Sequence, residues 1–556
     1  MMDFIKRYYQ SYSNWFIALL LTAATFVIHG TIVDGNWRWH DAQILFHLYN
    51  YPWYADFINP LVWQEYSPVN LTPWQVILYR LDYLLAGISP LIFYLHHVLA
   101  LAATATALFF VNALWVQKRF AIVSALLLLV GTPVFFVSEQ LMTRHYVEGT
   151  LYALVSLYLF VTGIRQSSQT RILASAALYA MAMASKEIFV PLAILLLAVP
   201  EGTFRARLKL LTPHFLLLAI YIIWRDHMLA SVVGGYGASS NYIDPEFMVT
   251  AAGKFLRIPV MLFAGAWWIA SLAFMTLVVL TIRAGRFPWL ITLLAGAMLL
   301  GPLYPLAGAP GFTAPDRYLF LVWVGISFSV GWMLHHIRHS PQTSRLLPVA
   351  LTSVGILCVF SYTQGQQVRA DLGLTATEFD VHTTFMLSTD SASAFIPTTS
   401  LAQDYWAVTD MLALGKALTG KDGPVPLPDD LFLTESIDHL FSYDSGCQCM
   451  QDISAALPDR RAAFVAANRP DAPLTAEFLY QNGLMSWKFG PYETGEFHVV
   501  SEVMGRLPVP VEIEGLRITV AQDTPIHIRY QSPEGWITYS DRLIIRHGIA
   551  GHWTRQ

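Results

Sequence analysis

Charged residues are scarce in this sequence. Asp, Glu, Lys and Arg together make up 13% of the 556 residues, about half of the roughly 25% that soluble domains carry. Hydrophobic residues make up 55%. This balance excludes a soluble globular protein and predicts a polytopic membrane protein.

Cysteine is scarce as well, and the chain has no excess of positive charge. The three cysteines, Cys358, Cys447 and Cys449, exclude a disulfide framework. A bridge between Cys447 and Cys449 would close a strained C-x-C ring, so a disulfide and a free pair are both open alternatives. The formal net charge of -4 argues against nucleic acid as a partner.

Apolar runs are what the sequence has in abundance. We expect about eleven membrane spans, the first of them a retained signal-anchor that follows Lys6 and Arg7. The fifth and sixth runs are short, which indicates a break around Ser185-Lys186-Glu187. The runs lie at roughly 15–33, 90–115, 120–138, 147–164, 171–185, 187–200, 211–230, 255–281, 288–308, 316–336 and 346–363.

Basic residues predict the orientation of these spans. With a cytoplasmic N-terminus, every inward connection carries at least two Lys or Arg residues, as the positive-inside rule requires. An odd number of spans then places the C-terminus outside. We therefore expect a bacterial inner-membrane protein with a periplasmic C-terminal domain, and the endoplasmic reticulum membrane is the alternative. The inward residues are Lys118, Arg119, Arg165, Arg171, Arg205, Arg207, Lys209, Arg283, Arg286, Arg338 and Arg345.

Two external segments are long. Residues 34–89 are dense in Trp and Tyr with apolar residues at helical spacing, which predicts amphipathic helices at the membrane interface. Sugar stacking on these rings is the functional alternative. Residues 364–556 carry more charge and end in alternating, strand-like patterns, which predicts a separate external α+β domain of unknown role after a membrane domain at 1–363.

Ionisable residues gather at the outer ends of the spans. Transporters need such groups near the membrane midplane, so this distribution disfavours transport and predicts a site that a lipid substrate enters at the outer rim. Local pairing with Asp226, Asp316 and Glu187 is the alternative role of the cations there. Four outward cations are candidates for binding a phosphate through charge-assisted hydrogen bonds: Arg225, Arg317, Arg144 and Lys186.

One carboxylate is conspicuous among the aromatic residues of the first external segment. Asp41 follows Trp37-Arg-Trp-His40 at the start of a helical pattern over 41–50, where it could deprotonate an attacking hydroxyl. The alternative is a helix N-cap, a role that suits Asp, and Asp34 is the second candidate for the base. No metal is expected, because no metal-site spacing relates His40, His96, His97 and His145.

Several motifs follow one another in the order of a known superfamily. Across about 1–340 the chain resembles the GT-C superfamily of polyprenyl-phosphate-sugar glycosyltransferases. It is most similar to the branch of the protein O-mannosyltransferases and the transmembrane O-mannosyltransferases with tetratricopeptide repeats, although its C-terminal domain does not resemble such repeats. The motifs are Trp37-Arg-Trp-His40-Asp41 through Asn50, Tyr66-Ser-Pro68, Arg80-Leu-Asp-Tyr83, Ile88-Ser-Pro90 to His96-His97, Ser185-Lys186-Glu187, Gly234-Gly-Tyr-Gly237 and Arg317-Tyr-Leu-Phe.

The resemblance implies a GT-C-like transmembrane catalytic domain over 1–363. It implies an inverting hexosyltransferase that moves a sugar from a polyprenyl phosphate or diphosphate to a hydroxyl of a protein, lipid or polysaccharide outside the membrane. The family often has a second acid where this chain has His40, so we expect no required cofactor, and a divalent metal is an open alternative that no acidic pair supports. The implied roles are a catalytic base for Asp41, donor-phosphate binding for Arg225, Arg317, Arg144 and Lys186, and acceptor-side support for Glu187, Tyr66 and His40.

Three other functions are compatible with the sequence. One is a lipid or polysaccharide transporter, and another is a polymerase or ligase of cell-surface polysaccharide that uses a diphosphate-linked donor. The third is a membrane-anchored scaffold in which residues 364–556 bind a glycan.

Overall fold

A computed structural model describes most of the chain. The motif at Gly234–Gly237, Pro68, Asp316 and most of the expected span at 288–308 lie outside the described residues. The described residues are 2–67, 69–232, 244–285, 295–296, 299–304, 317–390, 392–397, 405–433, 437–481, 484–502, 505–517, 524–545 and 550–555.

The chain divides into two compact units. Within the described residues, unit 1 covers 2–35, 70–232 and the described parts of 244–372. Unit 2 covers the described parts of 36–69 and of 373–555. The division after Leu372 falls inside helix α20 (Leu347–Ser388), as does the domain boundary expected after residue 363.

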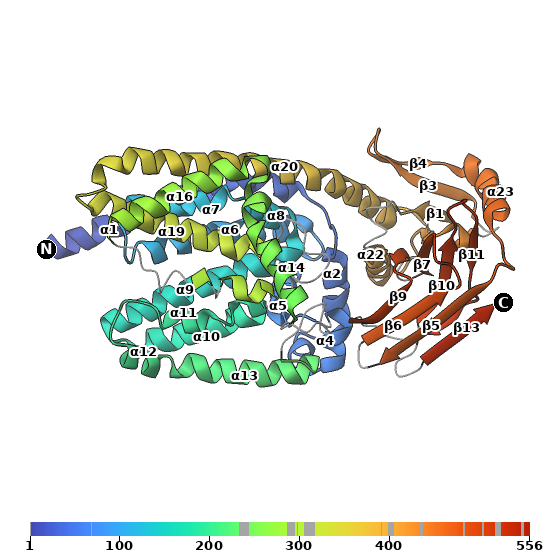
Figure 1. Ribbon diagram of the computed structural model, residues 1–556, viewed down its shortest axis with the longest axis horizontal. Coiled ribbons are helices and arrows are strands. Elements are labelled where there is room, and N and C mark those ends of the chain that lie inside the picture. Colours follow the sequence, from blue (N-terminus) through green and yellow to red (C-terminus); the bar gives the residue numbers. More distant parts are fainter. Residues whose placement is uncertain are drawn as a thin grey trace. The chain divides into compact units, whose positions relative to one another are not determined.

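Unit 1 consists of long apolar helices (Figure 1). The described residues contain six helices that are long and apolar enough to cross a membrane, or up to eight if each of two bent pairs is one span. The expected class of polytopic helical membrane protein is confirmed, while the number of eleven spans stays a prediction. The helices are α1 (Met2–His29), α5 (Pro73–Ala86), α6 (Pro90–Asn112), α7 (Lys118–Leu129), α8 (Thr132–Glu139), α9 (Arg144–Gln166), α10 (Gln169–Ser185), α11 (Leu192–Leu196), α12 (Phe204–Leu210), α13 (Thr212–Leu229), α14 (Pro245–Leu256), α15 (Ile258–Phe263), α16 (Trp267–Arg283) and α19 (Phe320–His339).

The expected span at 120–138 is broken in the middle. Helices α7 and α8 meet at an angle of 56°, because Pro133 in the first turn of α8 cannot continue the hydrogen bonds of α7. The indole N–H of Trp323 lies 3.2 Å from the carbonyl oxygens of both Leu127 and Leu128 and satisfies the freed end of α7. A Cβ at Gly131 would lie 1.9 Å from that indole nitrogen, so the contact requires glycine.

Unit 2 begins with short helices from the first external segment. These are α2 (Asp41–Asn50), α3 (Ala55–Ile58) and α4 (Pro60–Tyr66), and helix α22 (Tyr405–Thr419) packs against α2. Helix α4 starts where the side chain of Asn59 accepts backbone N–H bonds from Leu61 and Val62, with Pro60 in the first position.

The rest of unit 2 is rich in β-structure, as expected (Figure 1). One sheet has the order β2-β1-β3-β4, a second has the order β11-β10-β7-β8 with β12 also on β10, and a third has the order β13-β5-β6-β9. The alternating patterns of the sequence predict strands only from Glu496 onward, whereas β1 to β6 come earlier in the chain. The strands are β1 (Ser393–Ile396), β2 (Val425–Pro426), β3 (His439–Asp444), β4 (Cys449–Asp452), β5 (Leu474–Gln481), β6 (Leu484–Gly490), β7 (Glu496–Ser501), β8 (Gly505–Val509), β9 (Glu512–Arg517), β10 (Thr524–Gln531), β11 (Ile537–Tyr539), β12 (Leu543–Ile545) and β13 (Ala550–Arg555), and helix α23 is Leu457–Ala467.

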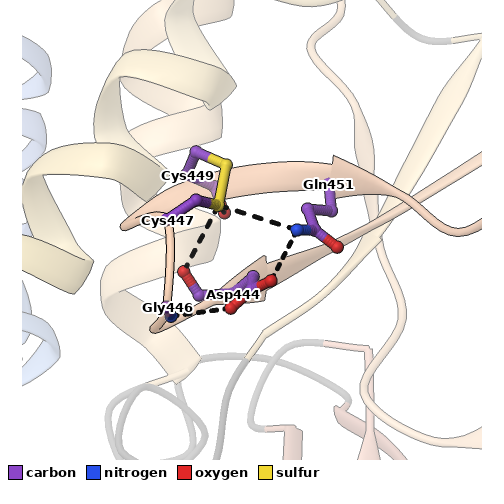
Figure 2. The surroundings of a disulfide bond; sticks show 5 residues. All are labelled: Asp444, Gly446, Cys447, Cys449 and Gln451. Carbon is purple, nitrogen blue, oxygen red and sulfur yellow. Dashed lines mark hydrogen bonds between the residues drawn. A yellow bond between two sulfur atoms is a disulfide. The ribbon is translucent and has the colours of Figure 1, made fainter.

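Cys447 and Cys449 form a disulfide at the turn between β3 and β4 (Figure 2). Of the two alternatives left open by the sequence, the structure shows the bonded pair, while Cys358 is a free thiol. Asp444 supports the turn, because its carboxylate accepts hydrogen bonds from the Gly446 backbone at 2.7 Å and from the Gln451 side chain at 2.5 Å.

Candidate functional site

A cluster of charged side chains forms in unit 1 where α10 ends. Ser185 is the last residue of α10, and Lys186 is extended with φ -164° and ψ 140° before a short 3-10 helix, Glu187–Phe189. This break brings both charged side chains to the end of α13, which carries Arg225. The break expected around Ser185-Lys186-Glu187 therefore exists, and it has a structural consequence.

Glu187 is the centre of this cluster. Its Oε1 atom accepts hydrogen bonds from the Arg225 guanidinium and, at 2.6 Å, from the Leu71 backbone N–H. The Lys186 Nζ atom lies 3.8 Å from Glu187 Oε2 and donates a 2.8 Å hydrogen bond to the Asn70 side chain. Lys186 and Arg225 are 8% and 4% exposed, so their charges are largely shielded from water.

Two tyrosine rings lie between Arg317 and Lys186 of the same cluster. Its guanidinium lies 5.2 Å from the Tyr318 ring centre, and that ring lies 6.3 Å from the Tyr146 ring. The Lys186 Nζ atom lies 5.8 Å from the centre of the Tyr146 ring. The positive charges are therefore arranged around tyrosine faces, where cations are attracted to the ring electrons.

Lys186 lies outside the helices that are long enough to cross a membrane. Burial above all, together with the Arg317 and Arg225 charges, lowers the pKa of its ammonium to about 8, and Glu187 opposes this shift. Lys186 and Arg225 thus share the Glu187 carboxylate, and the Arg317 charge acts on Lys186 as well. A group of cations in a shielded place favours an anionic ligand.

Arg144 belongs to a different ionic cluster. It is the first residue of α9 and is 0% exposed. Its guanidinium donates to the Asp82 carboxylate of α5 at 2.5 Å and to Glu148, one turn further along α9, at 2.8 Å. His96 of α6 is 2.8 Å from Asp82 and 3.5 Å from Glu148. Two carboxylates already balance this guanidinium, so the phosphate role given to Arg144 stays a prediction without support from its contacts.

Asp41 begins α2 in unit 2 and is 0% exposed. Its Oδ2 atom accepts a 3.1 Å hydrogen bond from the Arg38 backbone N–H, and its own N–H donates to the Arg38 carbonyl at 3.0 Å. His40 occupies the N-cap position without a side-chain capping bond. The Asp41 carboxylate thus organises the turn before α2, although it is not the N-cap itself.

Tyr66, at the end of α4, packs against α2. Its ring lies 4.6 Å from the His47 ring, and its carbonyl accepts a 3.2 Å hydrogen bond from Gln43. His47 forms a 2.6 Å contact with the Asp56 carboxylate, and both residues are buried. Sequence spacing gives no signal for this His–Asp pair, because its two members lie nine residues apart in an aromatic segment.

No group of three or more His, Cys, Asp or Glu residues suited to a metal ion occurs within the described residues.

Several ion pairs cannot be predicted from sequence spacing, because their two members lie far apart in the chain. Arg38 pairs with Asp380 and Asp82 with Arg144, whereas only the four-residue spacing of Arg144 and Glu148 was a local signal.

No protein-family model matches the chain, and no curated protein matches it. Among solved structures, the apo oligosaccharyltransferase of Archaeoglobus fulgidus is similar over 91% of this chain and 77% of that chain, with 11% identity and a TM-score of 0.45. ArnT of Cupriavidus metallidurans bound to undecaprenyl phosphate is similar over 79% of this chain and 94% of that chain, with 13% identity and a TM-score of 0.45.

A third similar structure is the Archaeoglobus fulgidus oligosaccharyltransferase AglB in complex with an inhibitory peptide and a dolichol-phosphate. It matches 91% of this chain and 76% of that chain, with 11% identity and a TM-score of 0.44. Identities and scores this low transfer no function from these proteins to this chain.

Proposed function

We propose that this protein is an integral-membrane glycosyltransferase of the GT-C type. It transfers a sugar from a polyprenyl phosphate or diphosphate to an acceptor hydroxyl on the outer face of the membrane, with inversion at the anomeric carbon. The observation that carries the proposal is the group of cations in unit 1, where Lys186 and Arg225 both contact Glu187 and the Arg317 charge acts on Lys186.

The cation cluster suits the phosphate of a lipid-linked donor. When the bond between sugar and phosphate breaks, negative charge grows on the departing phosphate oxygen. Shielded guanidinium and ammonium groups stabilise that charge more strongly than water does, and the planar Arg225 side chain can bind two phosphate oxygens together. Glu187 holds Lys186 and Arg225 in place before the donor arrives.

Asp41 is proposed as the catalytic base. A donor with a phosphate leaving group needs little acid catalysis, so the remaining task is to remove the proton of the attacking hydroxyl. The hydrogen bond from the Arg38 backbone fixes the orientation of the carboxylate. Its burial keeps away bulk water, which would otherwise compete with the acceptor as the nucleophile. One displacement then inverts the anomeric carbon without a covalent enzyme intermediate.

The C-terminal part of unit 2 is proposed to be exported. Disulfides persist in oxidising compartments such as the periplasm, and Cys447 and Cys449 are bonded. This agrees with the orientation that the basic residues of the connections predict.

The purified protein in detergent, incubated with a panel of polyprenyl-phosphate and polyprenyl-diphosphate sugars and hydroxyl acceptors, tests the proposal. We expect one donor to yield released lipid phosphate together with glycosylated acceptor. In Asp41→Asn, turnover should fall by ~10³-fold while donor affinity changes less than about threefold, because the amide can accept no proton. Asp34→Asn, at the exposed second candidate for the base, should keep its turnover if Asp41 is the base.

Two results would reject the proposal. One is that the wild-type protein releases no lipid phosphate from any donor while still binding or moving it, which would indicate a transporter. The other is full turnover in Asp41→Asn. Preference for diphosphate donors would instead place the protein with polysaccharide polymerases and ligases, and the presence of three cations that act on one another is one observation in favour of that second candidate.

A further inference from the structure

Helix α20 holds the three residues that precede His40 and Asp41. All of these contacts lie within unit 2. Asp380 receives two hydrogen bonds from Arg38, from Nε at 2.8 Å and from Nη2 at 2.6 Å. The Thr383 hydroxyl donates to the Trp37 carbonyl at 3.1 Å, and the Phe379 ring lies 5.7 Å from the Trp39 ring. Phe379, Asp380 and Thr383 share one side of the helix, because residues three and four apart are neighbours there.

The Arg38–Asp380 pair has the geometry that fixes a guanidinium most firmly. Two parallel N–H···O bonds between planar groups set both the distance and the orientation of the partners. The two side chains are 11% and 29% exposed, so water competes only in part. The backbone N–H of this same Arg38 donates to the Asp41 carboxylate, which makes a chain of contacts from Asp380 through Arg38 to Asp41.

The backbone between these contacts is held in an unfavourable conformation. Trp39 has φ +46°, a left-handed value that costs energy in any residue with a Cβ and is uncommon for a bulky aromatic. Such conformations persist where the surroundings over-determine them, and they occur often at functional sites. Here α20 contacts Trp37, Arg38 and Trp39 in succession, and Trp39 is 8% exposed.

We infer that Asp380 is a positioning residue for Asp41, acting through the Arg38 backbone. This inference rests on the proposed role of Asp41 as the catalytic base. Asp380 itself touches no substrate in this scheme. It keeps Arg38 in the one orientation that points its N–H at the Asp41 carboxylate, so that the base is aligned before the acceptor arrives. Misalignment by about 1 Å can cost ~100-fold in rate.

The variant Asp380→Asn in the full-length protein tests this inference. We expect kcat to fall by about 10- to 100-fold while KM for the lipid-linked donor changes less than about threefold, because the base loses alignment and the donor site is untouched. Asp380→Glu, which keeps a carboxylate for the Arg38 fork, should recover part of the loss. Asp371→Asn is the matched control, since Asp371 is an exposed aspartate of the same helix whose side chain accepts a local hydrogen bond from Gln367.

A double-mutant cycle separates action through Arg38 from a general effect on α20. If Asp380 acts through Arg38, then Arg38→Gln and Asp380→Asn combined should cost no more than the larger single loss. Additive losses in kcat would overturn the proposed route. An unchanged kcat in Asp380→Asn, together with an inactive Asp41→Asn, would also overturn the inference about Asp380. That result would leave the glycosyltransferase proposal in place.

Amide hydrogen exchange supplies a measurement that needs no activity. In Asp380→Asn, peptides that cover 36–46 should exchange faster than in the wild type, because the turn before α2 opens more often, while peptides of α22 and of the sheets should not change. Faster exchange in a protein whose wild type transfers no sugar would support the contact chain and reject the function. Unchanged exchange over 36–46 would overturn the inference.

Discussion

Unit 1 contains two buried arginine clusters that look alike in sequence and differ in charge. Around Arg225, the Glu187 carboxylate contacts two cations, Arg225 and Lys186, and the charge of a third, Arg317, acts on Lys186. Around Arg144, one guanidinium faces two carboxylates, Asp82 and Glu148, with His96 beside them. Both arginines are nearly or fully buried and both follow apolar or aromatic stretches.

The difference shows which property marks an anion site. Burial and a position at a helix end are common to both arginines, so neither property distinguishes them. The balance of neighbouring charge does, because a phosphate is attracted only where positive charge exceeds negative charge in a shielded place. By this criterion we expect Arg225 to serve the ligand and Arg144 to serve the packing of α5, α6 and α9.

The largest effect is expected from removing the guanidinium of Arg144, which lies in the cluster with Asp82 and Glu148, here called the carboxylate-rich cluster. Arg144→Leu leaves the Asp82 and Glu148 carboxylates buried without their cation, which should lower the free energy of unfolding by about 3–5 kcal/mol. Arg165→Leu, at the other end of α9, removes a pair with Glu201 in which the arginine is 39% exposed, and it should cost less than about 1 kcal/mol. Unfolding of the detergent-solubilised variants measures both free-energy changes. Equal losses in Arg144→Leu and Arg165→Leu would contradict the structural role expected for Arg144.

The second effect concerns binding rather than stability. Arg225→Gln should weaken the binding of a polyprenyl phosphate by ~100-fold, about 2.7 kcal/mol, because the cluster loses a bidentate phosphate ligand. Arg225→Lys should lose less, since it keeps the charge without the fork. Arg205→Gln, on the exposed helix α12, is the control and should bind normally. Wild-type affinity in Arg225→Gln would remove the distinction between the two clusters.

The third effect is a pH dependence. Because the pKa of Lys186 is lowered to about 8, its ammonium is mostly protonated near pH 7 and mostly neutral near pH 9, and a phosphodiester keeps its single charge throughout. Affinity for the donor should therefore fall by ~10-fold as the pH rises from about 7 to about 9. In Lys186→Arg the guanidinium stays charged over this range. A pH slope that survives in Lys186→Arg would show that another group is responsible.

The smallest effect is expected from neutralising one acid of the carboxylate-rich cluster. Asp82→Asn leaves Arg144 paired with Glu148 and keeps an oxygen for its guanidinium, so the loss should be about 1 kcal/mol. The same unfolding measurement checks it. A loss as large as that of Arg144→Leu would mean that both carboxylates are needed and that the cluster carries no excess negative charge.

Several elements follow directly from the sequence. The apolar run at 90–115 became α6 (Pro90–Asn112), and the run at 120–138 became α7 and α8. The bend between α7 and α8 has a local signal in Gly131-Thr-Pro133, although only the structure shows that Trp323 completes it. Strand β5 (Leu474–Gln481) was missed, because Ala476 and Glu477 are weak strand formers that pairing on both sides overrides.

The charged residues of the candidate site can be predicted from the sequence, whereas the ion pairs that they form cannot. Lys186, Glu187 and Arg225 are visible as charges at the ends of apolar runs. No local sequence signal indicates that Arg225 pairs with Glu187 rather than with its neighbour Asp226. Likewise, none indicates that Arg38 pairs with Asp380, which lies 342 positions later. The roles of Asp41, Tyr66 and His40 in the reaction stay predictions for the experiments above.

The apolar runs and alternating patterns of the sequence are enough to predict a helical membrane protein with an α+β C-terminal domain. Apolar length and alternation are local properties, and the cost of placing charge or an unpaired backbone in a bilayer leaves few other solutions. The balance of charge within each buried cluster is visible only in the folded protein. That balance depends on distances between side chains from separate helices, and these distances are set by packing rather than by position along the chain.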